Sequence, residues 1–159
     1  MRFNEFNYPT HQLTFTLVMG GAGSGKNYYI SHNPALNQAL LIDIDAFKQD
    51  MDLSTAIASI KPKLEDAFSK NIDVVHPTTG SSLIGQKNKI KLARKYDYMV
   101  NLILIDTNPK QAITQVQTRT QHGGHDVSID RIISSNDQAR ENYKQLIDLV
   151  DSAIIISHK

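Results

Sequence analysis

Hydrophobic positions along the chain follow two alternating patterns. Short apolar runs, often β-branched, are separated by longer segments in which apolar residues recur every three or four positions. Five short runs predict strands, at residues 13–19, 39–43, 73–75, 99–105 and 153–157. Each run is predominantly apolar, as expected of a strand that is covered on both faces. The alternation predicts βαβ units, and therefore an α/β fold with a five-stranded parallel sheet.

The longer segments predict helices, at residues 26–31, 53–69, 83–95, 109–121 and 129–150. Pro62 lies inside the second of these, so we expect that helix to be kinked or divided there. Polar residues 134–137 interrupt the apolar pattern of the last one. No repeat or linker divides the chain, and residues 1–159 are predicted to form a single domain.

Composition and charge narrow the classes of partner. Lysine and arginine number 17 against 16 acidic residues, so no global field would hold a polyanion, and a nucleic-acid partner is not favoured. The densest basic stretch, Lys87, Lys89, Lys91, Arg94 and Lys95, is interpreted as a solvated helix face, with nucleic-acid contact as the alternative. The sequence has no cysteine, which excludes disulfides and thiolate chemistry and is typical of a reducing compartment. The apolar runs are too short to span a bilayer and no signal peptide precedes them, so we expect a cytoplasmic protein without a membrane partner.

A glycine-rich loop follows the first predicted strand and leads into a predicted helix. It reads Gly20, Gly21, Ala22, Gly23, Ser24, Gly25 and Lys26. Glycines allow successive backbone N–H groups to converge on one anion, and the lysine then reaches the β- and γ-phosphates of a nucleotide. The strand, loop and helix order predicts a P-loop that binds ATP; the alternative is a glycine-rich turn without a ligand.

The residue after this lysine departs from the usual P-loop pattern. A serine or threonine hydroxyl normally binds Mg²⁺ at this position, and this chain has Asn27. An amide oxygen can also bind Mg²⁺, but with different geometry. Asn27 is therefore a candidate metal ligand, and it also raises the alternative of a module that binds nucleotide without turning it over.

Two aspartates end the second predicted strand. Asp43 and Asp45 would lie on one face if the strand continued, at the edge of the sheet where parallel α/β proteins bind ligands. A carboxylate there can accept a proton from an attacking hydroxyl or help to hold Mg²⁺. The alternative is that one of them caps a helix beginning at Ala46.

Polar residues also follow the third predicted strand. His76, Thr78 and Thr79 are candidates for orienting a substrate. The alternative is a turn in which Ser81 or Ser82 caps the next helix.

Three stretches together resemble the zeta-toxin-like P-loop kinases, relatives of the polynucleotide kinases. They are residues 20–26, residues 42–48 and residues 119–127, the last reading Arg-Thr-Gln-His-Gly-Gly-His-Asp-Val. The resemblance covers residues 13–156 and implies a three-layer, adenylate-kinase-like P-loop fold, with ATP and Mg²⁺ as cofactors. It also implies that Lys26 binds the β- and γ-phosphates, that Asp45 activates the substrate hydroxyl, and that Arg119 stabilises the transferred phosphoryl group.

The function predicted on these grounds is transfer of the γ-phosphoryl group of ATP to a hydroxyl of a small acceptor, a sugar nucleotide or a nucleotide. A polynucleotide 5′-kinase is an alternative, and so is the nucleotide-binding module raised by Asn27. The two glycines that follow Arg119, Gly123 and Gly124, predict a lid over ATP, with a flexible surface loop as the alternative. Nothing in the sequence identifies a protein partner.

Overall fold

The computed structural model describes residues 11–47, 51–121 and 128–157. Its strands are β1 (Thr14–Met19), β2 (Leu40–Leu41), β3 (Val74–Thr78), β4 (Met99–Asp106) and β5 (Ser152–Ser157). Its helices are α1 (Lys26–Ser31), α2 (Ile44–Phe47), α3 (Leu53–Ala58), α4 (Ile60–Ser69), α5 (Leu83–Lys95), α6 (Pro109–Gln121), α7 (Ile129–Leu146) and a final 3₁₀ turn, η2 (Ile147–Leu149).

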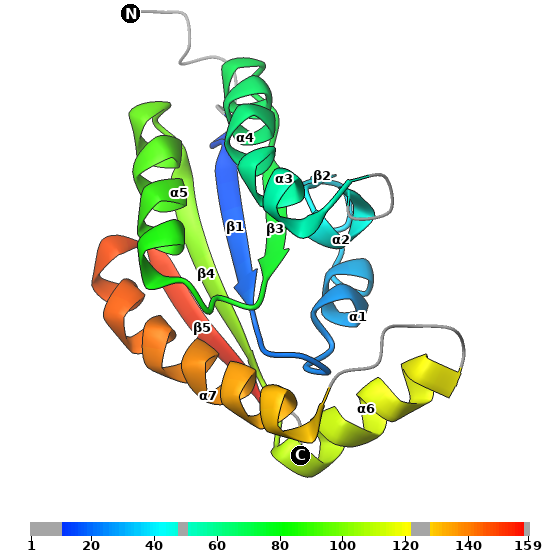
Figure 1. The fold of residues 1–159 in the computed structure, drawn as a ribbon. Coiled ribbons are helices and arrows are strands. Elements are labelled where there is room, and N and C mark those ends of the chain that lie inside the picture. Colours follow the sequence, from blue (N-terminus) through cyan, green and yellow to red (C-terminus); the bar gives the residue numbers. More distant parts are fainter. Residues whose placement is uncertain (1–10, 48–50, 122–127, 158–159) are drawn as a thin grey trace, which may run out of the picture.

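The five strands form one parallel sheet, as the sequence predicted, and their order is β2-β3-β1-β4-β5. β1 lies in the centre, with β3 on one side and β4 on the other. Because all strands run the same way, their carboxyl ends meet at one edge of the sheet, where α6 and the start of α7 also lie (Figure 1). The glycine-rich loop that leaves β1 opens at this edge.

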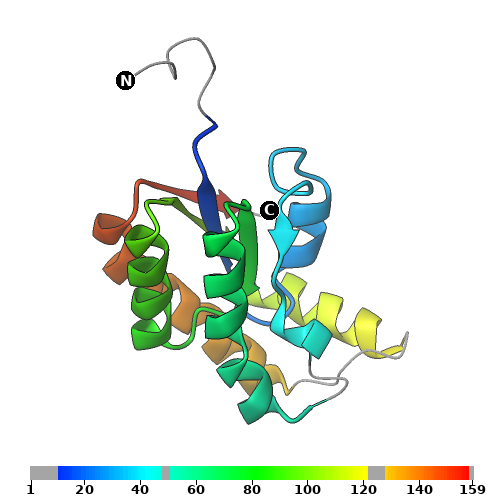
Figure 2. The ribbon, with the colours of Figure 1, turned by 90° about the horizontal axis from the view of Figure 1, so that it is seen from above.

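Helices cover both faces of the sheet. β1 directs Phe15, Leu17 and Met19 into a large core formed with α4, α5 and α7. Val18, on the opposite face, packs in a smaller core with Ile30 of α1. Figure 2 shows α4 and α5 on one side of the sheet and α1 on the other. The result is the predicted three-layer α/β architecture, and it explains why the central strands β1, β3 and β4 are apolar on both faces.

The second strand is shorter than the sequence predicted. Pairing with β3 ends at Leu41, and helix α2 begins at Ile44 rather than at Ala46. The prediction that Asp43 and Asp45 lie on one face of a continuing strand is therefore wrong. The side chain of Asp43 accepts a hydrogen bond from the Asp45 backbone N–H, 3.1 Å away, and this contact turns the chain out of the sheet into α2.

The predicted helix over residues 53–69 is divided, as expected, but before the proline. α3 ends at Ala58, and Ser59 is both its C-cap and the N-cap of α4. Pro62 thus lies in the first turn of α4, where a missing backbone N–H costs no helical hydrogen bond. By contrast, polar residues 134–137 do not interrupt the last helix, because α7 runs through them without a break.

The third strand extends beyond the predicted residues 73–75 and contains Pro77. The carbonyl of Val75 faces β2 and that of Thr78 faces β1, where they accept from Ile42 and Gly20. Alternation along the strand places Pro77 on the β2 side, beyond the last paired residue of β2. A proline is tolerated there because no neighbouring strand requires its missing donor.

Within the residues that the structure describes, no helix combines the length and the apolar character needed to cross a membrane.

Candidate functional site

The loop between β1 and α1 has the backbone form of a phosphate-binding turn. Gly25 has a φ of 89°, in the left-handed region that other residues adopt at a cost, and it caps α1. The backbone N–H of Gly20 is tied to the Thr78 carbonyl of β3 at 3.1 Å, so the start of the loop is anchored to the sheet. Lys26 is the first residue of α1. The residues present therefore fit a nucleotide triphosphate tail.

The N-terminal half of α7 holds this loop in place. The Ser135 hydroxyl accepts a hydrogen bond from the Ala22 N–H at 3.0 Å, and the Asn136 amide donates to the Ala22 carbonyl at 3.0 Å. Gly21 approaches so closely that an added Cβ would lie 2.4 Å from the Asn136 nitrogen. Ser135 and Asn136 are residues whose role could not be read from the sequence pattern, because their polarity indicated an interruption of the helix.

Replacing Asn136 by alanine should loosen the loop. Asn136 is 2% exposed, and its loss would leave the Ala22 carbonyl without its side-chain donor. A part-buried acceptor that loses its partner costs up to about 1–3 kcal/mol, so we expect a lower Tm and weaker ATP binding. Differential scanning fluorimetry with and without ATP measures both effects. Ser134→Ala is the matched control, because the Ser134 hydroxyl donates to a carbonyl of its own helix; equal effects of the two variants would contradict the clamping role.

Lys26 occupies the charged centre of the site. Its ammonium group donates to the carbonyls of Gly20 and Gly21, at 2.7 and 3.3 Å. Burial lowers the pKa of Lys26 to about 8, although the charges of Asp45 and Asp43 raise it and that of Arg119 lowers it further. All three predicted charged partners are therefore close enough to Lys26 to act on its titration. They come from α2, the turn before α2, and the last turn of α6.

Asp43 links the turn before α2 to the phosphate loop. Its carboxylate accepts from the Asn27 amide at 3.5 Å as well as from the Asp45 N–H. The capping alternative therefore describes Asp43, and Asp45 lies in the first turn of α2 with an exposed side chain. The exposure of Asp45 leaves it accessible to an acceptor molecule that approaches this edge of the sheet.

Two side chains that each carry an oxygen suitable for Mg²⁺ are neighbours here. The Asn27 amide and the Asp43 carboxylate are in contact, and hard divalent cations prefer such oxygens. Among the described residues, no three His, Asp or Glu side chains gather to form a metal centre of their own. Mg²⁺ in phosphoryl-transfer sites is usually held by one or two side chains together with substrate phosphates, so this donor set fits the ion.

His76 was selected as a residue that follows the third predicted strand. This expectation is wrong, because His76 lies inside β3. It is 2% exposed, and its Nδ1 lies 2.6 Å from the Ile42 carbonyl, which can only accept. Its Nε2 is 2.9 Å from Nζ of Lys89. Burial, with the nearby Lys89 charge, lowers the pKa of His76 to about 3, so the ring is neutral with its proton on Nδ1. Both ring nitrogens therefore have hydrogen-bond partners within the protein.

The two threonines selected with His76 lie at the sheet edge. The Thr78 hydroxyl accepts from the Gly80 N–H at 3.2 Å, and the Thr79 hydroxyl lies 3.1 Å from that of Ser81. Thr79 is exposed and Thr78 is half-buried. The helix cap predicted here is formed by Ser82, which accepts from the Gly85 N–H at 3.0 Å.

The last motif is only partly described. Arg119 lies in the last turn of α6. Residues 122–127, which include Gly123 and Gly124 of the predicted lid, lie outside the described residues.

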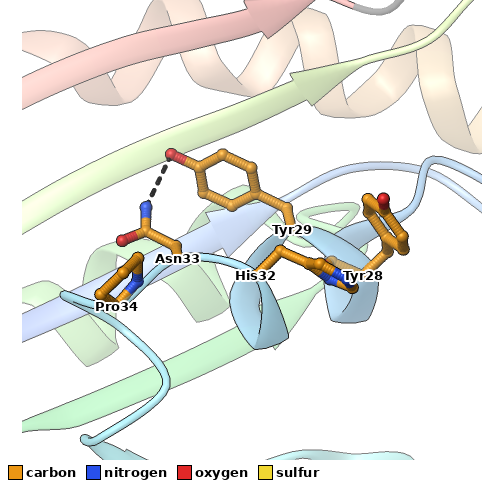
Figure 3. A pocket seen from close by; sticks show the side chains of 5 residues that line it. All are labelled: Tyr28, Tyr29, His32, Asn33 and Pro34. Carbon is orange, nitrogen blue, oxygen red and sulfur yellow. Dashed lines mark hydrogen bonds between the residues drawn. The ribbon is translucent and has the colours of Figure 1, made fainter.

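A surface hollow beside α1 is separate from this site. It has a volume of about 370 Å³ and is lined by Tyr28, Tyr29, His32, Asn33 and Pro34. Tyr28 stacks on His32 with ring centroids 4.0 Å apart, and the Asn33 amide donates to the Tyr29 hydroxyl (Figure 3). None of the loop glycines, Lys26 or the two aspartates lines it, so it is not the phosphate site.

Comparison with known proteins shows which solved structures share this fold. The sequence matches no protein-family model, and no curated protein matches it in sequence. Solved structures do match. A chain of the PezAT chromosomal toxin-antitoxin system of Streptococcus pneumoniae superposes with a TM-score of 0.76 at 15% identity, covering 95% of this chain and 70% of that one.

Two further structures are similar over less of their own length. A chain of the Pnkp1/Rnl/Hen1 RNA repair complex gives a TM-score of 0.71 at 16% identity, covering 88% of this chain and 48% of that one. A chain of the AvrRxo1-ORF1:-ORF2 complex with ATP gives a TM-score of 0.70 at 19% identity, covering 86% of this chain and 50% of that one. The chain thus spans about half the length of these two proteins. With its central P-loop strand and its 2-3-1-4-5 parallel sheet, the chain has the fold of the P-loop kinases, as the resemblance of its motifs implied.

Proposed function

We propose that the protein is an ATP-dependent phosphotransferase that moves the γ-phosphoryl group to a hydroxyl of a small acceptor. The observation that carries this proposal is the convergence of four charged side chains at the mouth of the glycine loop. Lys26, Asp43, Asp45 and Arg119 come from separate elements, and the last three all influence the pKa of the first. Similar structures include one with ATP, which is consistent with nucleotide binding here.

The groups present match the demands of phosphoryl transfer. The transferred group needs positioning and charge neutralisation more than covalent chemistry. Lys26 supplies one cation from the loop, and Arg119 supplies a planar guanidinium from α6 that suits phosphate oxygens. Asp45, exposed at the entrance, is the group that would accept the proton of the attacking hydroxyl.

Mg²⁺ would be held by Asn27 and Asp43. When bound, the ion supplies charge neutralisation for the phosphate oxygens. The Asn27 amide nitrogen donates to the Asp43 carboxylate at 3.5 Å, so the two side chains, each with an oxygen that can bind a hard cation, are neighbours. We place the protein in the cytoplasm, in agreement with its lack of cysteine.

Replacing Asn27 by threonine tests this metal role. A hydroxyl at this position gives the compact ligand of the usual P-loop, so we expect kcat at limiting Mg²⁺ to rise several-fold, roughly threefold to tenfold. Steady-state rates over a Mg²⁺ titration measure the change. Asn27→Val has the shape of threonine without the hydroxyl, and equal rates for the two variants would contradict the role of Asn27 in metal binding.

The phosphotransferase proposal is tested by following ADP formation with a panel of hydroxyl acceptors, beside calorimetric titration of ATP with and without Mg²⁺. Acceptor-dependent ADP formation supports the kinase. Tight ATP binding with no turnover for any acceptor supports instead the nucleotide-binding module. Turnover confined to 5′-hydroxyl oligonucleotides, with strong salt dependence, supports a polynucleotide 5′-kinase.

A further inference from the structure

A hydrogen-bonded pair, the buried His76 and the half-buried Lys89, joins β3 to α5, and the chemistry proposed above does not use it. Neutral His76 donates from Nδ1 to the Ile42 carbonyl at 2.6 Å and accepts at Nε2 from the Lys89 ammonium at 2.9 Å. Lys89 also donates to the Gln86 amide oxygen at 3.2 Å. The imidazole and the amide thus orient the ammonium group from two sides.

Lys89 carries a charge that the described part of the protein does not neutralise. Both of its partners are uncharged, and none of the ion pairs between described residues includes it. Burial lowers the pKa of Lys89 to about 8, so the group is still largely protonated at neutral pH. Even partial burial of an ammonium group costs free energy, and an accompanying anion offsets that cost. An ammonium has three N–H donors, and the two neutral partners use only two of them.

The pair adjoins two parts of the candidate site, the end of β3 and the turn before α2. His76 is two residues before Thr78, whose carbonyl holds the start of the phosphate loop, a distance of about 7 Å along the strand. Ile42, which receives the His76 hydrogen bond, directly precedes Asp43. An acceptor of the length of a small metabolite, with its hydroxyl near Asp45, would therefore reach Lys89.

We propose that Lys89 binds an anionic group of the acceptor, a phosphate or a carboxylate, and that His76 and Gln86 position its ammonium group for this contact. The proposal deepens the phosphotransferase function and rests on it. A carboxylate in place of the His76 imidazole would pair with Lys89 and compete with such a ligand, whereas the neutral imidazole leaves the charge available. The acceptor is then a small hydroxyl compound that is already an anion.

Matched acceptor pairs, each differing by a single anionic group, test this inference. Ribose with ribose 5-phosphate, and uridine with uridine 5′-monophosphate, differ by one phosphate; glycerol with glycerate differs by one carboxylate. We expect the anionic member of at least one pair to have a kcat/KM at least tenfold higher than its neutral partner. A tenfold ratio corresponds to the stabilisation that one hydrogen bond to a charged group provides. The pair that shows the preference distinguishes a phosphate from a carboxylate.

Variants of α5 then assign the preference to Lys89. Lys89→Gln should raise the KM of the anionic acceptor about 10- to 100-fold, the value of a hydrogen bond to a charged group, while the KM of ATP and the rate with the neutral member stay within about twofold. Lys89→Arg should recover part of the preference. Lys91→Gln removes one exposed charge from the same helix and should change nothing.

Several outcomes separate this inference from the proposed function. Equal use of charged and neutral acceptors by the wild type overturns it, as does a Lys89→Gln variant that slows both members alike, because that marks a purely structural pair. If ATP binds and no acceptor is turned over, the phosphotransferase proposal fails. Calorimetric titration of the same anions, with a non-hydrolysable ATP analogue present, then decides the inference: binding that Lys89→Gln abolishes supports it, and no binding by the wild type overturns it.

Discussion

Replacing Lys26 by alanine should abolish useful ATP binding and phosphoryl transfer together. Its ammonium group lies within the loop, bonded to the carbonyls of Gly20 and Gly21, so a phosphate entering the loop meets a cation already in place. A triphosphate would stabilise the protonated form and raise the lowered pKa of Lys26. Loss of a charge-assisted hydrogen bond should weaken ATP binding about 10- to 100-fold, and loss of charge stabilisation in the transition state should lower kcat by about 100-fold or more.

Calorimetry measures the ATP affinity of Lys26→Ala, and ADP formation measures its turnover. Lys61→Ala is a matched control, because it removes an exposed lysine of α4 far along the chain from the loop. Circular dichroism confirms that each variant is folded. A Lys26→Ala protein that binds ATP as tightly as the wild type would remove the basis for calling the loop a phosphate site.

The features visible in the sequence are those with a strong local signal. The glycine spacing before Lys26 identified the loop, because four of the six residues before it are glycines and few other structures require so many. Apolar runs identified all five strands. In β1, β3 and β4 the run reflects burial on both faces, whereas β2 and β5 are apolar but largely exposed. The sequence pattern was thus sufficient for the sheet and for the position of the loop within it.

The features that were misjudged depend on contacts between distant segments. β2 is an edge strand of only Leu40 and Leu41, both exposed, so its apolar run gave no information on where pairing stops. His76 was expected in a loop because the third strand was predicted to end at residue 75, yet β3 continues to Thr78. Hydrophobic periodicity cannot show that Asn136 points inward, since a buried polar side chain is stabilised there by a backbone carbonyl 114 positions away.

These contacts also explain how the site is assembled. Three pieces of the chain reach the loop from different directions: the turn before α2 through Asp43, the end of β3 through Thr78, and α7 through Asn136. Each makes a hydrogen bond to the loop or to the residue after it, so the loop is held at both ends and in the middle. A preorganised loop loses less entropy on binding than a free one, which favours nucleotide affinity.

Replacing Asp45 by asparagine should separate binding from chemistry. Asparagine has nearly the same shape as aspartate but cannot accept the proton of an attacking hydroxyl, so kcat should fall about 100- to 10,000-fold. ATP affinity should not fall, because the carboxylate of Asp45 would repel the phosphates rather than bind them. Single-turnover rates with saturating ATP measure the chemical step, and calorimetry measures the binding.

Asp43→Asn is the informative comparison, because asparagine can still accept the Asp45 N–H and cap α2. If Asp43 helps to hold Mg²⁺, this variant should need more Mg²⁺ and recover at high concentration of the ion. Asp45→Asn should stay slow at every Mg²⁺ concentration, because the missing group is a proton acceptor. A fully active Asp45→Asn protein would exclude Asp45 as the base, and the acceptor hydroxyl would then have to lose its proton to another group or directly to the phosphate.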